Sequence, residues 1–290
     1  MLTNLKIKRF RLRMNNTIKR SLSGLVFLAI MTGGLLWNPV IFALLMVFCI
    51  VVMMSEFLTI STGKFLNIPS ILSILTGVTL FSSIFLFKGY GFDSGILFAS
   101  LIPAAAMGAS FLYNKDIKSA YTSTGFHYSA ILYVALPFAL MNFVVFDNSN
   151  TFEPKLLLAM FILLWSSDVG AYVFGMTIGQ KYGKKLFPSI SPKKSWAGFW
   201  GGITSTLLAG YIIYYLDFTS ISLIHIIAIS LIINILGVLG DLVESQFKRN
   251  FGVKDSGNIM PGHGGLLDRF DGALLSFPVA LAYLKLFALI

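Results

Sequence analysis

Charged residues are scarce in this chain. Only 12% of its 290 residues are Asp, Glu, Lys or Arg, whereas 56% are hydrophobic. A soluble domain carries about 25% charged residues, so this chain lacks the polar side chains that a water-soluble surface needs. The scarcity excludes an ordinary soluble globular protein and indicates an integral membrane protein.

The chain also has a single cysteine and no Walker-type nucleotide-binding loop. The single cysteine, Cys49, excludes an internal disulfide, and within its apolar run it reads as a small packing residue. A Walker-type glycine–lysine loop is absent, so the usual NTPase route is not indicated. The sequence shows neither an internal repeat nor a low-complexity tract.

Acidic residues are absent from the first 20 positions, although the net charge of the chain is +10. Seven basic residues lie there: Lys6, Lys8, Arg9, Arg11, Arg13, Lys19 and Arg20. A basic cluster beside a hydrophobic span is typical of a cytoplasmic anchor on anionic lipid. We therefore predict a basic cytoplasmic tail at 1–20, a retained signal anchor after it, and no nucleic-acid partner.

Long hydrophobic runs are what the chain has in abundance. A membrane-spanning helix needs about 20 mostly apolar residues. Nine runs approach that length: 21–37, 40–60, 71–87, 96–112, 127–146, 156–179, 197–216, 223–247 and 266–290. The first two are separated by Asn38 and Pro39, a pair that favours a tight turn. The predicted fold class is all-α, a polytopic membrane protein with about nine transmembrane helices.

The loops between these runs differ in charge. With the N-terminus in the cytoplasm, 19 of the 22 basic residues fall on the cytoplasmic side, and only Lys88, Lys155 and Lys285 fall outside. This asymmetry supports a cell-membrane protein with a cytoplasmic N-terminus. Seven of the twelve acids lie in 156–290. We therefore predict a transmembrane scaffold over 21–155 and a catalytic region over 156–290.

Acidic residues gather where the eighth span ends and the ninth begins. Asp241, Ser245 and Lys248 share one helix face with Glu244, at spacings of three and four residues. Asp268 and Asp271 share a face at the start of the ninth span. Carboxylates that converge repel one another unless cations lie between them, and hard oxygen donors suit Mg²⁺.

That acidic cluster has a plainer interpretation as a set of salt bridges. Lys248, Arg249 and Arg269 are close enough in sequence to neutralise it. So many acids are rarely buried for stability alone, which favours the metal site.

Two basic loops flank these acids. Lys254, Asp255 and His263 lie among glycines in the loop 248–265, and Gly264-Gly265 opens the ninth helix. Glycines let backbone N–H groups approach a polyanion, and a helix N-terminus attracts anions. The alternative is a solvated flexible loop.

The second basic loop follows the sixth span. Asp168 shares a face of that span with Tyr172, and the loop 180–196 holds five lysines. Its segment Ser191-Pro192-Lys193-Lys194 makes a plausible phosphate site opposite the acids, although lysines there also follow from the positive-inside rule. Together the acids and bases suit phosphoryl or nucleotidyl transfer.

The C-terminal motifs carry a family resemblance. Ser245-Gln246-Phe247-Lys248-Arg249, Lys254-Asp255-Ser256-Gly257 and the run from Pro261 to Asp271 resemble the signature of the phosphatidate cytidylyltransferases, or CDP-diacylglycerol synthases. Asp168-Val169-Gly170-Ala171-Tyr172 and Ser191-Pro192-Lys193-Lys194 resemble that family's second block. Ala197 stands where the family usually has glutamate, so no role is carried over to it.

The resemblance implies an all-helical homodimeric membrane enzyme that uses CTP and phosphatidate to make CDP-diacylglycerol and pyrophosphate. It implies that Asp241 and Asp268 hold Mg²⁺. A second cation, either monovalent or divalent, could bind beside it, and the sequence does not decide between one ion and two. The residues expected in catalysis are Asp241, Asp268, Lys248, Arg249, His263 and Arg269. Those expected in substrate binding are Asp168, Ser191, Lys193, Lys194, Ser245, Lys254, Asp255, Gly264, Gly265 and Asp271.

Three other functions share part of this residue pattern. A CDP-alcohol phosphotransferase is rejected because its motif needs further aspartates, and no acid follows Asp271. A CTP-dependent polyprenol kinase remains a minor alternative. A secondary transporter places its acids near the bilayer midplane, often in two matching halves, whereas these acids cluster at one end of one half.

Overall fold

The computed structural model describes residues 22–113, 117–180, 183–260, 262 and 264–290, and most of them are helical. An apolar helix, Leu22–Leu36, precedes the labelled elements. The α-helices are α2 (Pro39–Thr62), α3 (Ile68–Tyr90), α4 (Leu101–Ser110), α5 (Ile117–Ala130), α6 (Leu136–Leu140), α7 (Asn142–Val145), α8 (Lys155–Phe174), α9 (Trp196–Tyr215), α10 (Leu223–Asn250) and α11 (Leu267–Leu286). The 3₁₀ turns η1 (Ser94–Ser100) and η2 (Phe111–Tyr113) flank α4, while π-helical turns join α5 to α6 (η3, Ile131–Ala135) and extend α8 (η4, Gly175–Gly179).

Each predicted hydrophobic run overlaps a helix in the described part of the chain. Six helical stretches there are long and apolar enough to cross a membrane: Pro39–Thr62, Ile68–Tyr90, Ser94–Tyr113, Ala120–Val145, Lys155–Gly179 and Leu223–Asn250. The helix Leu22–Leu36 is shorter, α9 is rich in glycine, and α11 carries Asp268, Arg269, Asp271 and Lys285. The membrane character is thus evident, while the number nine stays a prediction.

The all-α class is wrong in one detail. Two short antiparallel strands, β1 (Lys185–Phe187) and β2 (Ser191–Ser195), form a hairpin between α8 and α9, with Lys185 opposite Ser195 and Phe187 opposite Ser191. This lysine-rich segment lies outside the apolar core. Pairing the two strands satisfies backbone groups that no helix would satisfy there.

The first long helices begin and end at residues that the sequence marks. Asn38 accepts a hydrogen bond from the Ile41 backbone N–H at 2.9 Å, and Pro39 takes the first helical position of α2. Asn67 caps α3 in the same way. Asn and an adjacent Pro are favoured at helix starts, so the predicted break at Asn38-Pro39 is confirmed.

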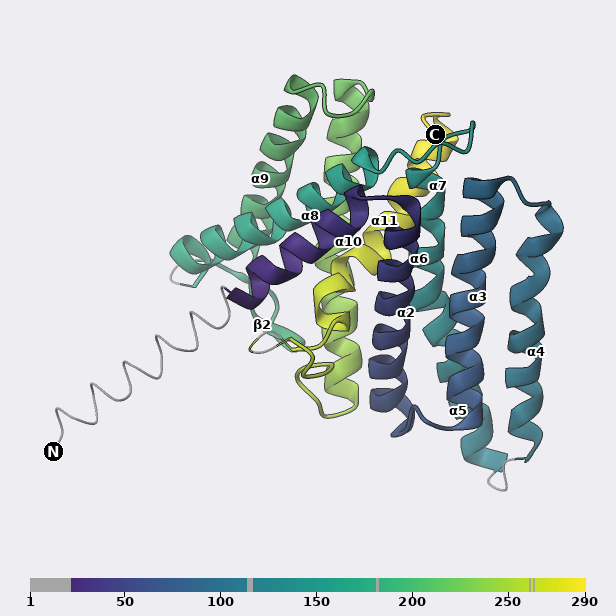
Figure 1. Ribbon diagram of the computed structural model, residues 1–290. Coiled ribbons are helices and arrows are strands. Elements are labelled where there is room, and N and C mark those ends of the chain that lie inside the picture. Colours follow the sequence, from purple (N-terminus) through teal and green to yellow (C-terminus); the bar gives the residue numbers. More distant parts are fainter. Residues whose placement is uncertain (1–21, 114–116, 181–182, 261, 263) are drawn as a thin grey trace, which may run out of the picture.

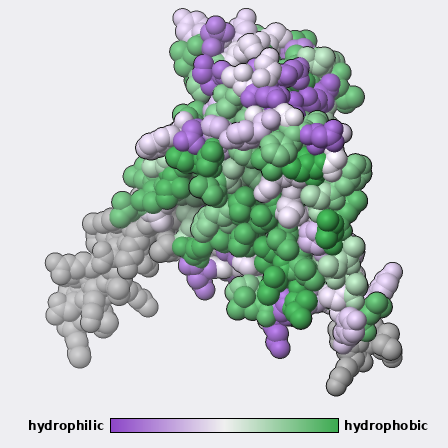
Figure 2. Space-filling model, turned by 45° about the vertical axis from the view of Figure 1, so that its right-hand side comes forward, coloured by the Kyte–Doolittle hydropathy of each residue, from purple (hydrophilic) through white to green (hydrophobic). Residues whose placement is uncertain are grey.

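The chain alternates between two ends of the molecule (Figure 1). The α2–α3 connection, the α10–α11 loop and the β-hairpin lie toward the lower part of that view, and the C-terminus lies at the top. Hydrophobic residues cover much of the middle of the surface, and hydrophilic residues gather most densely at its upper end (Figure 2). Helices α2 to α4 stand beside one another on one side, and α8 to α11 occupy the other.

Phe270, at the start of α11, ties the two sides together. Its ring lies 5.8 Å from the Phe27 ring, 5.1 Å from Phe138 and 6.0 Å from Phe161. Phe57 of α2 stacks on Phe247 of α10 at 4.5 Å. Aromatic contacts of this kind add to the burial of apolar area, so they fix the end of α10 against α2, and the start of α11 against α6, α8 and the helix Leu22–Leu36.

Candidate active site

A polar cavity of about 360 Å³ opens between α8, α10, the start of α11 and the β-hairpin. Four carboxylates line it: Asp168, Asp241, Asp268 and Asp271. Three cationic side chains line it as well: Lys193, Lys194 and Arg269. The structure therefore brings seven of the predicted site residues to one cavity, from four separate segments of the chain.

Asp241 lies at the mouth of this cavity on α10. Its carboxylate forms an ion pair with Lys194 of β2 at 2.7 Å and accepts a hydrogen bond from the Ser245 hydroxyl at 3.2 Å. The Lys194 ammonium also donates to the Val238 carbonyl at 3.2 Å. The hairpin thus delivers a cation directly to the carboxylate, and Ser245, one helical turn away, holds that carboxylate in place.

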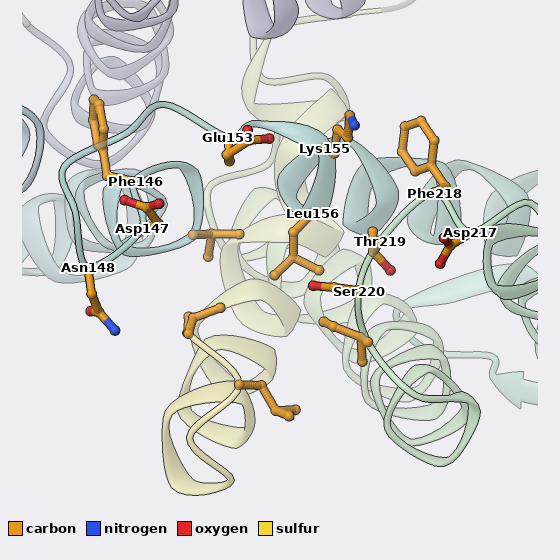
Figure 3. Close-up of a pocket in the computed structure, with 14 residues that line it drawn as sticks. Phe146, Asp147, Asn148, Glu153, Lys155, Leu156, Asp217, Phe218, Thr219 and Ser220 are labelled. Carbon is orange, nitrogen blue, oxygen red and sulfur yellow. The ribbon is translucent and has the colours of Figure 1, made fainter.

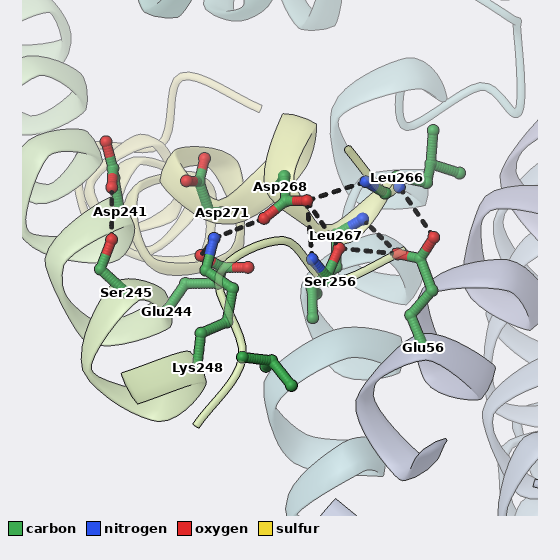
Figure 4. Close-up of polar contacts among 12 residues, drawn as sticks. Glu56, Asp241, Glu244, Ser245, Lys248, Ser256, Leu266, Leu267, Asp268 and Asp271 are labelled. Atoms are coloured by element: carbon green, nitrogen blue, oxygen red, sulfur yellow. Dashed lines mark hydrogen bonds and ion pairs between the residues drawn. The ribbon is translucent and has the colours of Figure 1, made fainter. Parts of the chain in front are cut away.

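Asp268 is the most densely bonded carboxylate of the site (Figure 4). Its Oδ1 atom accepts from the Lys248 ammonium. Its Oδ2 atom accepts from the backbone N–H groups of Ser256 and Gly265, at 2.9 and 2.8 Å, and from the Ser256 hydroxyl at 3.0 Å. Gly264 has φ of +85°, which a non-glycine residue rarely adopts, so this close wrapping of the loop depends on glycine.

Lys248 lies between two acids. Its ammonium contacts Asp268 and pairs with Glu244 at 2.5 Å, and Glu244 is fully buried. A buried carboxylate is tolerated only when a partner compensates its charge. The spacing in the sequence predicts that Glu244 shares a helix face with Asp241 and Lys248, but it does not predict a role for Glu244 in the site. The structure shows it as the inner partner of Lys248.

Glu56 is a part of the site that the sequence reasoning missed. It lies on α2, and its carboxylate accepts from the backbone N–H groups of Leu266 and Leu267 at 3.0 and 2.8 Å and from the Ser256 hydroxyl at 3.1 Å. The available signal was a single acid inside the apolar run 40–60. An ionisable residue within a membrane span is expensive and usually has a specific role.

Asp271 and Asp168 complete the acidic side of the cavity. The Asp271 carboxylate accepts from the Gly272 backbone N–H at 2.7 Å. It also experiences the charges of Asp241, Glu244 and Asp168. Like charges that act on one another favour a cation nearby, and the metal at these carboxylates stays a prediction.

The remaining predicted residues lie away from the cavity or outside the described residues. Arg249 is exposed and donates to the Val253 carbonyl at 2.8 Å, and Lys254 and Asp255 are exposed in the same loop. Ser191 begins β2 but is not among the residues that line the cavity. His263 lies outside the described residues. Their predicted roles remain predictions.

The donor set suits a hard divalent cation, because carboxylate oxygens are the ligands that Mg²⁺ prefers. Among the described residues, however, no three carboxylate, imidazole or thiol groups already meet around a common point. Lys194 neutralises Asp241, and Lys248 neutralises Asp268. The two predicted metal ligands are therefore paired with lysines in this structure, and a bound cation has to share or displace those contacts.

A second polar hollow, of about 500 Å³, lies at the opposite end of the molecule beside α7, the start of α8 and the C-terminus (Figure 3). Asp147, Glu153 and Lys155 line it. The Asp147 carboxylate accepts from the backbone N–H groups of Ser149 and Thr151, both at 2.8 Å, within its own turn. This hollow contains none of the predicted site residues, so the cavity at α10 and α11 is the candidate active site.

Comparison with known proteins identifies the family of the chain. The profile of the Cytidylyltransferase family matches residues 18–287. This chain belongs to that family. The match covers both halves of the molecule, so membership of the cytidylyltransferase family is not limited to the C-terminal signature.

Curated relatives extend the match. The phosphatidate cytidylyltransferase of Staphylococcus saprophyticus subsp. saprophyticus is 34% identical over 262 residues, which cover 90% of this chain and 96% of the relative. The protein of the same name from Staphylococcus epidermidis is 31% identical over 265 residues, again with 90% and 96% coverage. That from Staphylococcus aureus strain COL is 31% identical over 262 residues, with the same coverage. Family and relatives support a nucleotidyltransferase enzyme.

Proposed function

We propose that this chain is a phosphatidate cytidylyltransferase, which transfers CMP from CTP to phosphatidate and gives CDP-diacylglycerol and pyrophosphate. The observation that carries the proposal is the cavity in which Asp168, Asp241, Asp268 and Asp271 face Lys193, Lys194 and Arg269. It is built from the segments that resemble the family signature. The names of the curated relatives supply the substrate class.

The reaction forms one bond and breaks one. A phosphate oxygen of phosphatidate attacks the α-phosphorus of CTP, and the bond from that phosphorus to the oxygen bridging to the β-phosphate breaks. Pyrophosphate leaves with the electron pair of the broken bond. The attacking phosphate is already anionic, so the site needs little general-base assistance, and catalysis depends on positioning and on neutralising charge.

The role that we propose for each side chain follows from its position in or near the cavity. Lys193, Lys194 and Arg269 line the cavity and supply positive charge for the phosphates of CTP and of the lipid. Lys248 lies deeper, between Glu244 and Asp268, where it stabilises the carboxylate that the resemblance implies as a metal ligand. Ser245 orients Asp241.

Mg²⁺ is the cofactor that we propose, held by Asp241 and Asp268, with Asp271 and Asp168 lining the same cavity. When bound, such an ion neutralises the charge that develops on the departing pyrophosphate. Whether a second cation binds as well stays part of the proposal.

The proposed setting is a bacterial cell membrane crossed nine times, with the N-terminus and the cavity on the cytoplasmic side and two copies forming a homodimer. Nineteen of the 22 basic residues on one side support the orientation. Soluble CTP is present in the cytoplasm, and phosphatidate offers its headgroup at the same surface. Both substrates then reach the cavity without crossing the bilayer.

Single cysteines test this orientation. In a Cys49→Ala background, cysteines placed at Ser189 and Asn258 should resist a membrane-impermeant thiol reagent in intact cells and react once the cells are opened. A cysteine at Ser149, near the opposite hollow, is the matched control and should react in intact cells. The reverse labelling pattern would place the cavity outside and remove its supply of CTP.

A nucleotide panel tests the function itself. Purified protein in detergent is given phosphatidate, Mg²⁺ and one of CTP, dCTP, ATP, GTP or UTP, and lipid-linked nucleotide and pyrophosphate are measured. We expect equal amounts of both products, formed with a cytidine nucleotide. Equal turnover with all five nucleotides, or none with CTP, would contradict the proposal.

A further inference from the structure

Glu56 stands out because it comes from the half of the chain predicted to be scaffold. Its contacts join residues 200 and more positions away: Ser256, Leu266 and Leu267. Phe57, the next residue of α2, stacks on Phe247 of α10. The carboxylate is therefore carried to the site by a helix that is itself packed against the site.

The contacts of Glu56 replace a missing helix cap. Helix α11 begins at Leu267, and its own N-cap residue, Leu266, supplies no side-chain hydrogen bond. The first backbone N–H groups of a helix have no partner within that helix. Glu56 accepts from two of them, through Oε1 to Leu266 and Oε2 to Leu267. A negative charge at this end is also favoured by the helix dipole.

The same carboxylate is linked to Asp268 by one hydroxyl group. The Ser256 Oγ atom lies 3.1 Å from Glu56 Oε2 and 3.0 Å from Asp268 Oδ2. Ser256 is buried, at 7% exposure, and its backbone N–H also donates to Asp268 (Figure 4). Glu56 and Asp268 thus both form hydrogen bonds with Ser256, and so they hold the same short stretch of loop.

Two glycines of the loop lie close against the Glu56 carboxylate. A Cβ atom added to Gly257 would collide with the Glu56 carboxylate, and one added to Gly265 would lie 2.6 Å from both of its oxygens. Leu266 and Leu267 are buried beside them. The loop therefore packs closely against the Glu56 carboxylate and is also hydrogen-bonded to it.

From these contacts we propose that Glu56 is a positioning residue for the reaction. It fixes the N-terminus of α11 and the Ser256 turn, and through them the place of Asp268 in the cavity. The inference rests on the proposed function, because it assigns Glu56 to the carboxylate that we expect to hold the cation. It also makes the N-terminal half a contributor to the active site.

Glu56→Gln tests the proposal. The amide has one acceptor oxygen instead of two and turns an NH₂ group toward backbone donors, so at least one helix-start contact is lost. Ser55→Ala is the matched control, because the Ser55 hydroxyl donates within α2, to the Val52 carbonyl at 2.7 Å. Three quantities are compared with the unmodified chain: amide hydrogen exchange over 256–268, the split between kcat and KM for CTP, and the Mg²⁺ concentration for half-maximal rate.

Glu56→Gln should exchange about tenfold faster at Leu266 and Leu267, lower kcat about tenfold or more, and raise the Mg²⁺ requirement, with KM for CTP little changed. Ser55→Ala should match the unmodified chain in all three. Exchange and kcat at the unmodified values in Glu56→Gln would overturn the proposal. So would a variant that loses only thermal stability and keeps a normal kcat and Mg²⁺ requirement.

A second variant covers the case in which Glu56→Gln does not assemble. Ser256→Ala removes only the hydroxyl shared by Glu56 and Asp268 and leaves the backbone contact to Asp268. It should lower kcat and raise the Mg²⁺ requirement in the same direction, by a smaller factor; no change in either would overturn the proposal. Hydrogen exchange needs no substrate, so an unmodified chain that makes no CDP-lipid would refute the proposed function while the exchange of Glu56→Gln still decides whether Glu56 orders the loop.

Discussion

The two halves of the molecule pack by different means. The core of the N-terminal half is built from large side chains, among them Phe42, Met46 and Met53 on α2, all fully buried. In the C-terminal half the helices approach at glycines. A Cβ added to Gly202 would lie 2.6 Å from Asn234 Oδ1, and one added to Gly240 would lie 2.5 Å from the Asp271 carbonyl oxygen.

This difference explains where a reaction site fits. Small residues let membrane helices approach closely, so α10 and α11 bring their carboxylates into one cavity without bulky side chains between them. The N-terminal half carries larger buried side chains at its core and packs beside the site. Glu56 is the exception that connects the two halves, because it reaches from the N-terminal half into the site.

The largest expected effect comes from the acids of the C-terminal half. Asp241→Asn or Asp268→Asn should lower kcat about a hundredfold or more, because an amide does not neutralise a divalent ion. Asp147→Asn, at the opposite hollow, is the control and should keep full activity. Turnover assays on protein that elutes as an assembled species measure the effect. Near-normal turnover in either site variant would remove that carboxylate from the mechanism.

The next largest effect is expected from the loss of Lys248. Comparing it with the loss of Arg249 tests a buried cation against an exposed one. Lys248→Met leaves Glu244, at 0% exposure, and Asp268 without their shared cation. Removing one partner of a buried ion pair costs about 3–5 kcal/mol, so both stability in detergent and activity should fall sharply. Arg249→Ala changes an exposed side chain and should cost little stability.

Thermal unfolding of the two variants decides this contrast, and turnover of Arg249→Ala tests its predicted catalytic role. If Arg249→Ala is as damaging as Lys248→Met, the structural distinction between these neighbours is wrong.

A smaller effect is expected from one added methyl group. Gly240→Ala places a Cβ against the Asp271 carbonyl and the Gly272 Cα. Overpacking of this kind costs about 1–3 kcal/mol and should push the C-terminal part of α10 and the start of α11 apart, which lowers kcat. Gly33→Ala is the matched control, since nothing lies within 4 Å of an added Cβ there. Equal melting temperatures for the two variants would refute the packing contrast.

The smallest effect is expected at Ser245. Its hydroxyl donates to Asp241 at 3.2 Å, and Lys194 already pairs with the same carboxylate. A hydrogen bond to a charged group contributes about 1.5–3 kcal/mol, and the remaining ion pair limits the loss. Ser245→Ala should therefore lower kcat several-fold and lower thermal stability only slightly. A loss as large as that of Asp241→Asn would give Ser245 a direct role.

Much of the fold follows from local signals in the sequence. Hydrophobic length locates the helices, and Asn38 with Pro39 marks the first break, because capping acts over three or four residues. The convergence of Asp241 and Asp268 also follows, since both lie at the ends of helices joined by one loop. The helix count is harder, because α11 carries charges that reduce its hydropathy.

Long-range and orientational features do not follow from the sequence. Glu56 meets partners about 200 positions away, and an apolar run gives no sign of which helix faces it. Lys248 and Arg249 are adjacent and chemically alike, yet one turns inward to two acids and the other outward to the Val253 carbonyl. The β-hairpin is set by backbone pairing over three to five residues, which hydropathy does not detect.

The proposed enzyme transfers the CMP group of CTP, which contains the α-phosphorus, to the phosphate of phosphatidate. It does not transfer the terminal γ-phosphate. Purified protein with phosphatidate and Mg²⁺ is given CTP labelled with ³²P at either the α or the γ position. With the α label, radioactivity should enter the lipid, and with the γ label it should appear only in pyrophosphate. Asp241→Asn should abolish both signals. Radioactivity in the lipid from γ-labelled CTP would show a kinase and contradict the account.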